Sequence, residues 1–379
     1  MSDITISPVR GSSDLRSFIM MVWELYRDDL NWVPPIIADR KKLLDVKRNP
    51  FYKHAEMELF LAWRGKDVVG RIAAIVNRAH NETHGDSVGF FGFFECIDDQ
   101  SVANRLFAAA EKWLADRGMT VVRGPVNPSL NDEAGLLVEG FNDPPQILMT
   151  YNPNYYSRLI ETYGFRKSKD LLAYRLTRKG FLNPKLERVQ ALVREREGLA
   201  VRAARFKPRE AFQRDVAILK EIYNAAWEPN WGFVKMTDEE FAFLAADLKQ
   251  VADPDLVLIA ERNGVPVGFA LGLPDINQAL IYNRRGGMVG AGVALLTRKK
   301  KITRGRILVL GVIPSFQRLG IDAVLYYEIG TRMTDGHGYT EGEASWILED
   351  NVMMNRAAEM MNGEVYKRYR LYDKTVNKN

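Results

Sequence analysis

The chain repeats one local pattern at a nearly constant distance along the sequence, and this repeat limits the possible folds more than any other feature. An alanine is followed eight residues later by a glycine inside a predicted β-hairpin, and an asparagine is followed twelve residues later by a glycine around a predicted helix. Because repeated local order at a fixed offset indicates duplication, the 379 residues are predicted to form two similar domains. The pairs recur 198 or 199 residues apart, as Ala62/Gly70 with Ala260/Gly268 and as Asn152/Gly164 with Asn351/Gly363.

Each half has the same predicted order of elements: a strand, helical segments, a β-hairpin, then strands and helices in alternation. This order predicts an α/β fold with a mixed sheet. In the first half the elements are predicted at 4–9, 13–29, 59–76, 88–97, 100–118, 120–123, 153–163 and 170–176. In the second half they are predicted at 199–205, 210–226, 237–250, 256–271, 306–313, 317–334, 342–348, 352–361 and 366–372, after a linker helix at 184–197.

One segment of the second half predicts a binding site. Residues 306–313 are apolar and rich in β-branched side chains, as in a buried strand, and Pro314 and Ser315 end the run. An amphipathic helix is predicted from about Gln317, with Gly320 in the turn. Backbone N–H groups that have no partner inside the helix, together with the positive end of the helix dipole, make such a turn a site for anions. The alternative is a strand–turn–helix corner in which the glycine only relieves crowding.

The turn Gln317-Arg318-Leu319-Gly320-Ile321-Asp322 resembles the Gln/Arg-x-x-Gly-x-Gly/Ala pyrophosphate loop of the GNAT acyl-CoA N-acyltransferase superfamily. The resemblance implies two tandem GNAT-like domains, at 1–178 and 198–379, joined by a linker at 179–197. It also implies acyl-CoA as co-substrate, and a monomer whose two copies form a pseudo-dimer. The sequence departs from the family at Asp322, where the loop has a small residue, because a carboxylate opposes pyrophosphate unless it caps the helix or pairs with Arg318.

The resemblance also implies which residues bind the cofactor. In the family, backbone groups of the fourth strand contact pantetheine and the thioester carbonyl, the loop binds pyrophosphate, and an asparagine after the fifth strand approaches the CoA arm. Transferred to this sequence, these residues are Leu310, Gly311, Val312, Gln317, Arg318, Leu319, Gly320, Ile321, Asp322, Ala323 and Asn351. The family's frequent tyrosine acid, seven residues after that asparagine, is replaced by Ala358. Tyr366 and Tyr369 are the candidate substitutes, although the ring of either could equally pack in a strand.

Acyl transfer to an amine needs a group that removes a proton from the amine. Glu349 and Asp350 end the predicted fifth strand and are candidates, with a helix N-cap or first-turn role as the alternative. Glu133 lies in the long polar loop 124–135 of the first half, where loops tend to carry function. Glu95 lies in an aromatic strand, where desolvation raises the pKa of a carboxyl group, unless its side chain faces outward.

The first half lacks the features of a phosphate loop. The matching segment, 97–104, contains no glycine and carries Asp98 and Asp99, so the N-terminal copy is predicted to be degenerate and to help build the acceptor pocket. His80 and His84 have the spacing of a helical metal site, but their segment is predicted to be a loop, and no metal is expected.

A basic insert interrupts the second half at 275–305. From Ile276 to Arg306 there are eight cations and no acid, and without them the net charge of +5 becomes −3. The local charge argues against nucleic-acid binding, and its apolar stretch 288–296 predicts peripheral contact of 284–301 with an anionic membrane. A solvated loop, an acidic carrier protein and the CoA phosphates are the alternatives. Neither a signal peptide nor a membrane-spanning run is visible, so a cytoplasmic protein, peripheral on the inner face of the membrane, is expected.

These patterns predict acyl-CoA-dependent N-acylation of an amine, with one cofactor site in the second half. The insert favours a lipid-like amine and a long acyl chain. The whole-chain pattern resembles a group of bacterial GNAT-like proteins associated with ceramide synthase activity, which implies a sphingoid base such as 3-oxosphinganine as acceptor. The alternatives are acetylation of a small soluble amine or peptide, and a non-catalytic acyl-CoA-binding protein at the membrane.

Overall fold

The computed structural model describes residues 3–228 and 230–376, which pack into two compact units. The two units are defined by which segments pack together. The predicted boundaries at residues 178 and 198 divide the chain into sequence repeats instead, and they stay a prediction. The first unit comprises Met1–Leu171, Leu280–Ala294 and Lys367–Asn379, and the second comprises Leu172–Ala279 and Leu295–Tyr366.

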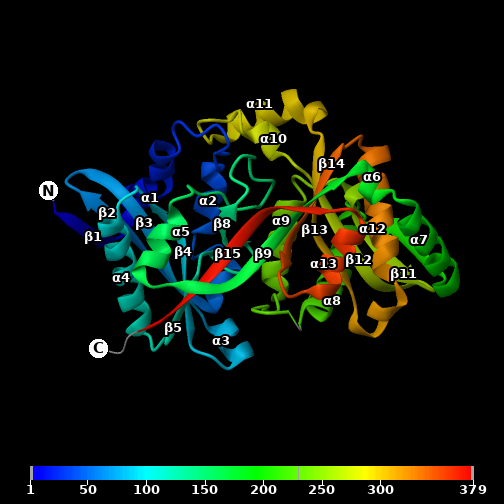
Figure 1. The fold of residues 1–379 in the computed structure, drawn as a ribbon, viewed down its shortest axis with the longest axis horizontal. Helices are drawn as coiled ribbons and strands as arrows, with labels where there is room; N and C mark the ends of the chain where they lie inside the picture. Colours follow the sequence, from blue (N-terminus) through cyan, green and yellow to red (C-terminus); the bar gives the residue numbers. More distant parts are fainter. Residues whose placement is uncertain (1–2, 229, 377–379) are drawn as a thin grey trace. The chain divides into compact units, whose positions relative to one another are not determined.

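The first unit is built on a sheet in the order β1-β2-β3-β4-β5 (Figure 1). Neighbouring strands are antiparallel up to β4, and β4 and β5 are parallel. Its strands are β1 (Ile4–Pro8), β2 (Ala55–Arg64), β3 (Asp67–Asn77), β4 (Val88–Cys96), β5 (Val121–Gly124), β6 (Val126–Asn127), β7 (Glu133–Ala134) and β8 (Leu136–Glu139). Its helices are α1 (Gly11–Leu25), α2 (Ile37–Leu43), η1 (Pro50–Lys53), α3 (Arg78–His84), α4 (Gln100–Ala115) and α5 (Tyr156–Tyr163).

The second unit repeats this order as β10-β11-β12-β13-β14, again antiparallel except for the last pair. Its strands are β10 (Leu199–Ala203), β11 (Val257–Arg262), β12 (Val265–Pro274), β13 (Arg304–Val312) and β14 (Glu341–Leu348). Its helices are α6 (Arg178–Phe181), α7 (Pro184–Glu197), α8 (Arg209–Trp227), α9 (Asp238–Leu248), η2 (Pro254–Leu256), η3 (Lys299–Lys301), η4 (Pro314–Leu319), α12 (Ile321–Thr331), η5 (Arg332–Gly336) and α13 (Val352–Met360). Four further elements contain residues of both units: β9 (Arg166–Thr177), α10 (Asn277–Leu280), α11 (Met288–Arg298) and β15 (Glu364–Thr375).

The predicted repeat is present in the strand register of both units. Ala62 pairs with Gly70 across the β2–β3 hairpin, and Ala260 pairs with Gly268 across the β11–β12 hairpin. In each hairpin the register shifts directly after the alanine. A Cβ in place of Gly70 would collide with Leu106 of α4, the helix after the fourth strand, at 2.7 Å, and one in place of Gly268 would be in tight contact with Leu325 of α12, the corresponding helix, at 3.3 Å. The glycines are therefore where this helix packs on the hairpin.

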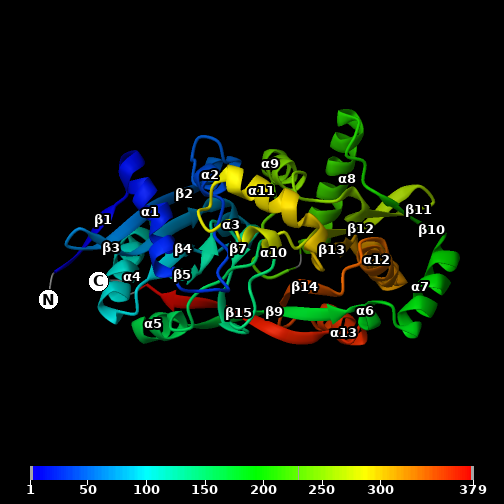
Figure 2. The ribbon, with the colours of Figure 1, turned by 90° about the horizontal axis from the view of Figure 1, so that it is seen from above.

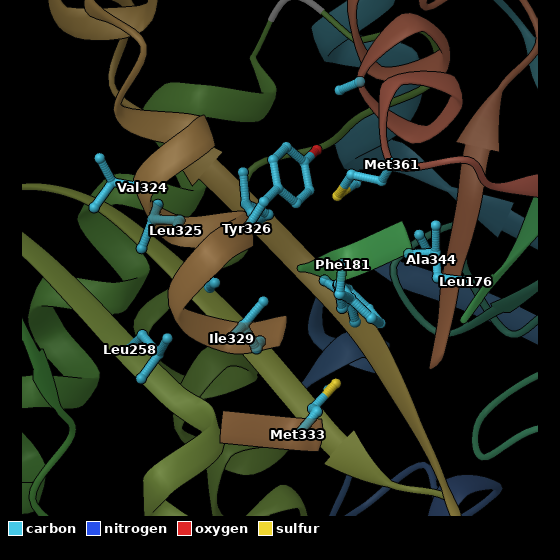
Figure 3. Close-up of a cluster of buried hydrophobic side chains, with 14 of the residues drawn as sticks. Leu176, Phe181, Leu258, Val324, Leu325, Tyr326, Ile329, Met333, Ala344 and Met361 are labelled. Carbon is cyan, nitrogen blue, oxygen red and sulfur yellow. The ribbon is translucent and has the colours of Figure 1, made fainter. Parts of the chain in front are cut away.

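Alternation along the strands of the second unit directs side chains to two layers of helices. Leu258 and Ala260 of β11 belong to the core cluster with α12, whereas Val257 and Ile259 pack with α8 residues. Figure 2 shows α8 and α12 on opposite sides of these strands. The α12 side of the core is filled by residues from β9, β11, α12, β14 and the end of α13, including Leu176, Leu258, Val324, Leu325, Tyr326, Ile329, Ala344 and Met361 (Figure 3).

The C-terminal strand differs from its prediction. The sequence predicts 366–372 as the last strand of the second repeat, but β15 extends to Thr375 and its end packs in the first unit. There Tyr372–Thr375 pairs antiparallel with the Val121–Gly124 strand. Local patterns show that a segment is extended, but they do not choose its partner, which depends on contacts distant in sequence.

Two further segments differ from expectation in local structure. The histidine segment predicted as a loop is the helix α3, because Asn77 caps its start by accepting from the N–H of His80 and Gly85 ends it at a φ of 62°. The apolar stretch of the insert is the helix α11. Among the described residues, none of the helices is both long and apolar enough to span a bilayer.

Candidate active site

Two central strands of the second unit separate part of the way along their length. The parallel pairing of β13 with β14 runs from Arg304 and Glu341 to Ile307 and Ala344, and then ends, although both strands continue. Leu308 is an extra residue in β13 at this point, since the register with β12 shifts between Val309 and Ile307. A bulge bends its strand, and the β13–β14 pairing ends at the residue before it.

The predicted thioester-contacting residues lie in the separated half of β13. Leu310, Gly311 and Val312 pair with β12 on one edge. A Cβ on Gly311 would overlap the Trp227 ring at the end of α8, so glycine is required for this ring to lie against the strand. Trp227 is stacked on Tyr223 at a centroid distance of 5.0 Å. The strand residues predicted to contact the thioester are therefore next to an aromatic surface.

The predicted phosphate loop has the expected strand–turn–helix form. Pro314–Leu319 is a 3-10 turn rather than the start of the helix, and α12 begins at Ile321. Gly320 has a φ of 79°, in the left-handed region that favours glycine. The Gln317 amide donates to the Val312 carbonyl at 3.0 Å and ties the loop to the strand. Arg318 is exposed.

The acid at the end of the loop lies in the first turn of α12, and among the described residues no side-chain hydrogen bond caps the start of this helix. Burial raises the pKa of Asp322, and the backbone N–H groups of Ala323 and of Asp322 itself lower it by less. Because pyrophosphate binds at the positive end of a helix, the negative charge of this carboxylate competes with it there.

This competition predicts that Asp322→Asn increases the affinity for CoA about tenfold, a change of about 1.4 kcal/mol, because a negative charge next to the phosphates is removed. In the wild type, affinity should increase as the pH falls toward the raised pKa of Asp322, since bound polyanion favours the protonated carboxyl. Calorimetry at several pH values measures both effects. Asp238→Asn, which removes an acid from the first turn of α9 in the same unit, is the control and should change neither.

A buried polar cluster, which the sequence did not reveal, lies where the two strands separate. Arg306 and Glu343 face each other in the parallel register and are 2% and 0% exposed. Arg306 Nε donates to Ser345 Oγ at 2.8 Å, and Ser345 Oγ and the Tyr366 hydroxyl each donate to the Glu343 carboxylate. Ala344 belongs to the core on the α12 side, so its neighbours Glu343 and Ser345 face the other side. The cluster therefore brings the candidate Tyr366 to a buried carboxylate.

Tyr366 is held by its ring as well as by its hydroxyl. The Arg175 guanidinium lies 4.4 Å from the ring centroid, and the residue is half-buried. One weak signal for Glu343 is present in the sequence, since it is an acid inside an apolar strand. Arg306 is one of the eight cations of the segment from Ile276 to Arg306, but the strand register pairs it with Glu343 in the interior.

The predicted bases after β14 lie in the turn before α13. Glu349 is half-buried and Asp350 is exposed. Asn351 is the N-cap of α13, and its side-chain oxygen accepts from the N–H of Met354 at 3.2 Å. The Asn355 amide donates to the carbonyls of Leu348 and Glu349, which fixes this turn against the helix. A contact between Asn351 and the CoA arm stays a prediction.

Glu133, Glu95 and Tyr369 belong to the first unit, whereas the other candidate site residues belong to the second. Glu133 lies in the short strand β7. Its carboxylate forms a two-point ion pair with Arg40, at 2.7 and 3.1 Å, and accepts from Asn127. Glu95 accepts from the hydroxyls of Tyr26 and Tyr156, and burial raises its pKa. The acids of the first unit therefore lie in a network of bonded partners.

The turn of the first unit that corresponds to the phosphate loop has a carboxylate at its helix N-terminus. Asp99 caps α4 by accepting from the N–H of Ser101 at 2.8 Å, and its other oxygen pairs with Arg64. Asp98 pairs with Arg158. That this copy does not bind polyphosphate stays a prediction, with which these contacts agree.

The residues that the structure brings together as possible metal ligands are not the histidines of the 80–84 segment that the sequence suggested. Burial lowers the pKa of His80 to about 4, although its Nε2 lies 3.5 Å from the Asp86 carboxylate. Asp253, Asp255 and His337 each place one possible ligand atom within 4.8 Å of the others. Partly exposed acids commonly gather in this way without an ion, so the group carries no further conclusion.

Comparison with known proteins gives full-length matches. The chain is 37% identical over 382 residues to the bacterial ceramide synthase of Caulobacter vibrioides, covering 99% of this chain and 98% of that protein. It is 36% identical over 373 residues to protein YghO of Escherichia coli, covering 97% and 94%. The fold matches a tandem GNAT protein from the clavulanic acid biosynthesis pathway over 100% of both chains, with a TM-score of 0.57 and 11% identity. No family model matches the chain.

Proposed function

Because this chain belongs to the family of tandem GNAT-fold proteins that includes the Caulobacter ceramide synthase and YghO, we propose that it transfers an acyl group from acyl-CoA to the amine of a sphingoid base. The observation that carries the proposal is the separation of β13 from β14, with the phosphate loop at one end and the Glu343–Tyr366 pair at its root. The proposed cofactor-binding residues are Leu310–Val312 of β13, Gln317–Ala323 of the loop and the start of α12, and Asn351.

The proposed reaction is a direct attack of the amine on the thioester. The C–N bond forms as the carbonyl becomes tetrahedral, and the C–S bond then breaks to release CoA thiolate. Backbone N–H groups in the separated half of β13 are suited to stabilise the charge that develops on the carbonyl oxygen. Holding both reactants there removes the entropic cost of bringing them together.

We propose that Tyr366 and Glu343 take up the proton that the amine loses. The Tyr366 hydroxyl already donates to Glu343, so its oxygen can accept a proton from the attacking amine while its own proton passes to the carboxylate. Arg306 holds Glu343 in place through its contacts with Ser345. Glu349 and Asp350 remain alternative bases, closer to solvent.

A lipid-like acceptor is supported by the helices α8 and α9. None of the residues of α9 is buried, although the helix carries Phe241, Phe243 and Leu244, all half-exposed. On α8, Tyr223 and Trp227 are also half-exposed. Such large side chains are normally inside a protein, and here they offer an apolar surface close to β13 on which alkyl chains can pack.

The proposal is tested by release of free thiol from acyl-CoAs of several chain lengths in the presence of a panel of amines, with mass spectrometry of the products. Formation of the amide of a sphingoid base is the expected result. If the only products are amides of water-soluble amines, the acceptor is a soluble amine and not a lipid. If acyl-CoA binds but no amine of the panel causes release of its thiol, the chain would be a non-catalytic binding protein.

The proton relay predicts that Tyr366→Phe lowers kcat about a hundredfold, because general base catalysis contributes a factor of this order. KM for acyl-CoA should change little, since the ring and its contact with Arg175 are kept. Steady-state kinetics across pH measures the effect, and Tyr339→Phe, at another buried tyrosine of the unit, is the control. Unchanged turnover would rule out the relay and direct attention to Glu349 and Asp350.

A further inference from the structure

The helix α11 exposes its large apolar side chains and buries small ones. A helix on the surface of a globular protein normally buries its large apolar side chains and exposes polar ones. In α11 the buried residues are Ala291 and Ala294, whereas Val289 is 82% and Leu296 is 86% exposed. Val293, between them on the same face, is also exposed. The helix therefore packs with small residues and presents a stripe of large apolar residues to its surroundings.

Exposed apolar residues also lie outside this face of α11. Met288 and Tyr282 are exposed as well, so five of the large exposed hydrophobic residues lie between positions 282 and 296. Contiguous apolar patches are uncommon on soluble monomers and mark sites of protein or membrane contact. We name this surface, formed by Tyr282, Met288, Val289, Val293 and Leu296, the α11 patch.

Exposed cations border the α11 patch. Lys299, Lys300 and Lys301 form the turn η3 directly after the helix and are exposed, and Arg285 is exposed before it. The segment from Ile276 to Arg306 contains no acid that would neutralise them locally. An apolar stripe beside a cluster of cations matches the interface of an anionic bilayer, where alkyl chains and negative head groups lie side by side.

Not all cations predicted for this surface belong to it. Arg284 donates to the backbone carbonyls of Trp32 and Asp29, and its own carbonyl accepts from the Trp23 indole at 2.8 Å. Gly286 accepts from the N–H of Ile37. These contacts, all inside the first unit, hold the start of the insert on the α1–α2 region. The insert is therefore an attached element that presents one helix face, not a free loop.

We infer that the α11 patch docks the protein on an anionic lipid bilayer, with Val289, Val293 and Leu296 entering the head-group region and Lys299–Lys301 contacting the lipid phosphates. This inference extends the lipid-acceptor part of the proposed function, because an acceptor dissolved in a bilayer must be met at its surface. An acidic protein offers the other partner chemistry, but it would not need a continuous apolar stripe.

The test measures flotation of the purified full chain with vesicles, in the absence of acyl-CoA and amine, so that it is independent of the catalytic proposal. The chain should float with vesicles of phosphatidylglycerol and phosphatidylcholine and much less with phosphatidylcholine alone. Changing Lys299, Lys300 and Lys301 to Gln should weaken binding about a hundredfold at low salt, at about a factor of five per cation. The triple variant Val289→Ser, Val293→Ser, Leu296→Ser should weaken it at least tenfold at any salt concentration.

Matched variants on other surfaces separate docking from general charge or hydrophobicity. Lys66, Lys185 and Lys207, all exposed, are changed to Gln together, and Val46, Leu192 and Val265 are changed to Ser together. Both controls should bind anionic vesicles like the wild type. The inference is overturned if the α11 variants bind as well as their controls, or if the wild type does not bind vesicles, which would direct the search to an acidic protein partner. Thiol release in detergent, measured separately, reports on the proposed function.

Discussion

Gly320→Trp is expected to abolish the binding of acyl-CoA while the chain remains folded. Gly320 lies in the left-handed region and forms the turn whose N–H groups are proposed to hold pyrophosphate, so an indole there should displace the turn that forms the anion site. In the wild type, a hundredfold excess of ligand over Kd stabilises a protein by about 2.7 kcal/mol, which is visible as a shift in Tm. That shift should disappear in the variant.

The control is Gly338→Trp. Gly338 also has a positive φ, 71°, in the same unit, and a Cβ there meets no atom within 4 Å. Both variants therefore carry a similar backbone cost, about 1–2 kcal/mol. Only Gly320→Trp alters the proposed phosphate loop, where a Cβ would also lie 3.0 Å from the Val193 side chain of α7. A Gly320→Trp protein that keeps the ligand-induced shift in Tm would show that acyl-CoA binds elsewhere. A wild type whose Tm does not respond to saturating acyl-CoA would remove the cofactor assignment.

Arg306→Met is expected to lower the free energy of unfolding by about 3–5 kcal/mol, because it leaves the Glu343 carboxylate buried without its cation. Denaturant unfolding measures this loss. Adding Glu343→Gln to Arg306→Met should restore much of the stability, since the uncompensated charge is then gone while a partner for Tyr366 remains. The double variant should have little activity if Glu343 receives the proton.

The same two strands supply the control for this prediction. Arg304 and Glu341 face each other two residues before Arg306 and Glu343, in the same register and with a 3.1 Å ion pair, but both side chains are partly exposed. Arg304→Met should therefore cost no more than about 1 kcal/mol. Equal losses for the two arginine variants would mean that water reaches the Arg306–Glu343 pair in solution, and would weaken the case for a proton relay shielded from solvent.

Much of the fold could be predicted because its signals are local. The helix predicted at 184–197 is α7, Pro184–Glu197, which begins at a capping asparagine followed by proline and ends at a glycine with a positive φ. The Ala–Gly pairs that revealed the repeat are cross-strand partners in both hairpins. Local signals also predicted β13, the turn at Gly320 and the helix after it. Hydrophobic periodicity and turn residues act within a few positions of the sequence.

The sequence by itself determined the repeated fold, the phosphate-loop candidate and the apolar, basic character of the insert. Only the tertiary structure decided that Arg306 meets Glu343, that the end of β15 joins the sheet of the first unit, and that α11 turns its valines and its leucine outward. Each of these depends on which distant segment packs against a given strand or helix. Local sequence limits the shape of a segment, but its partner is chosen by the burial and strand pairing of the whole chain.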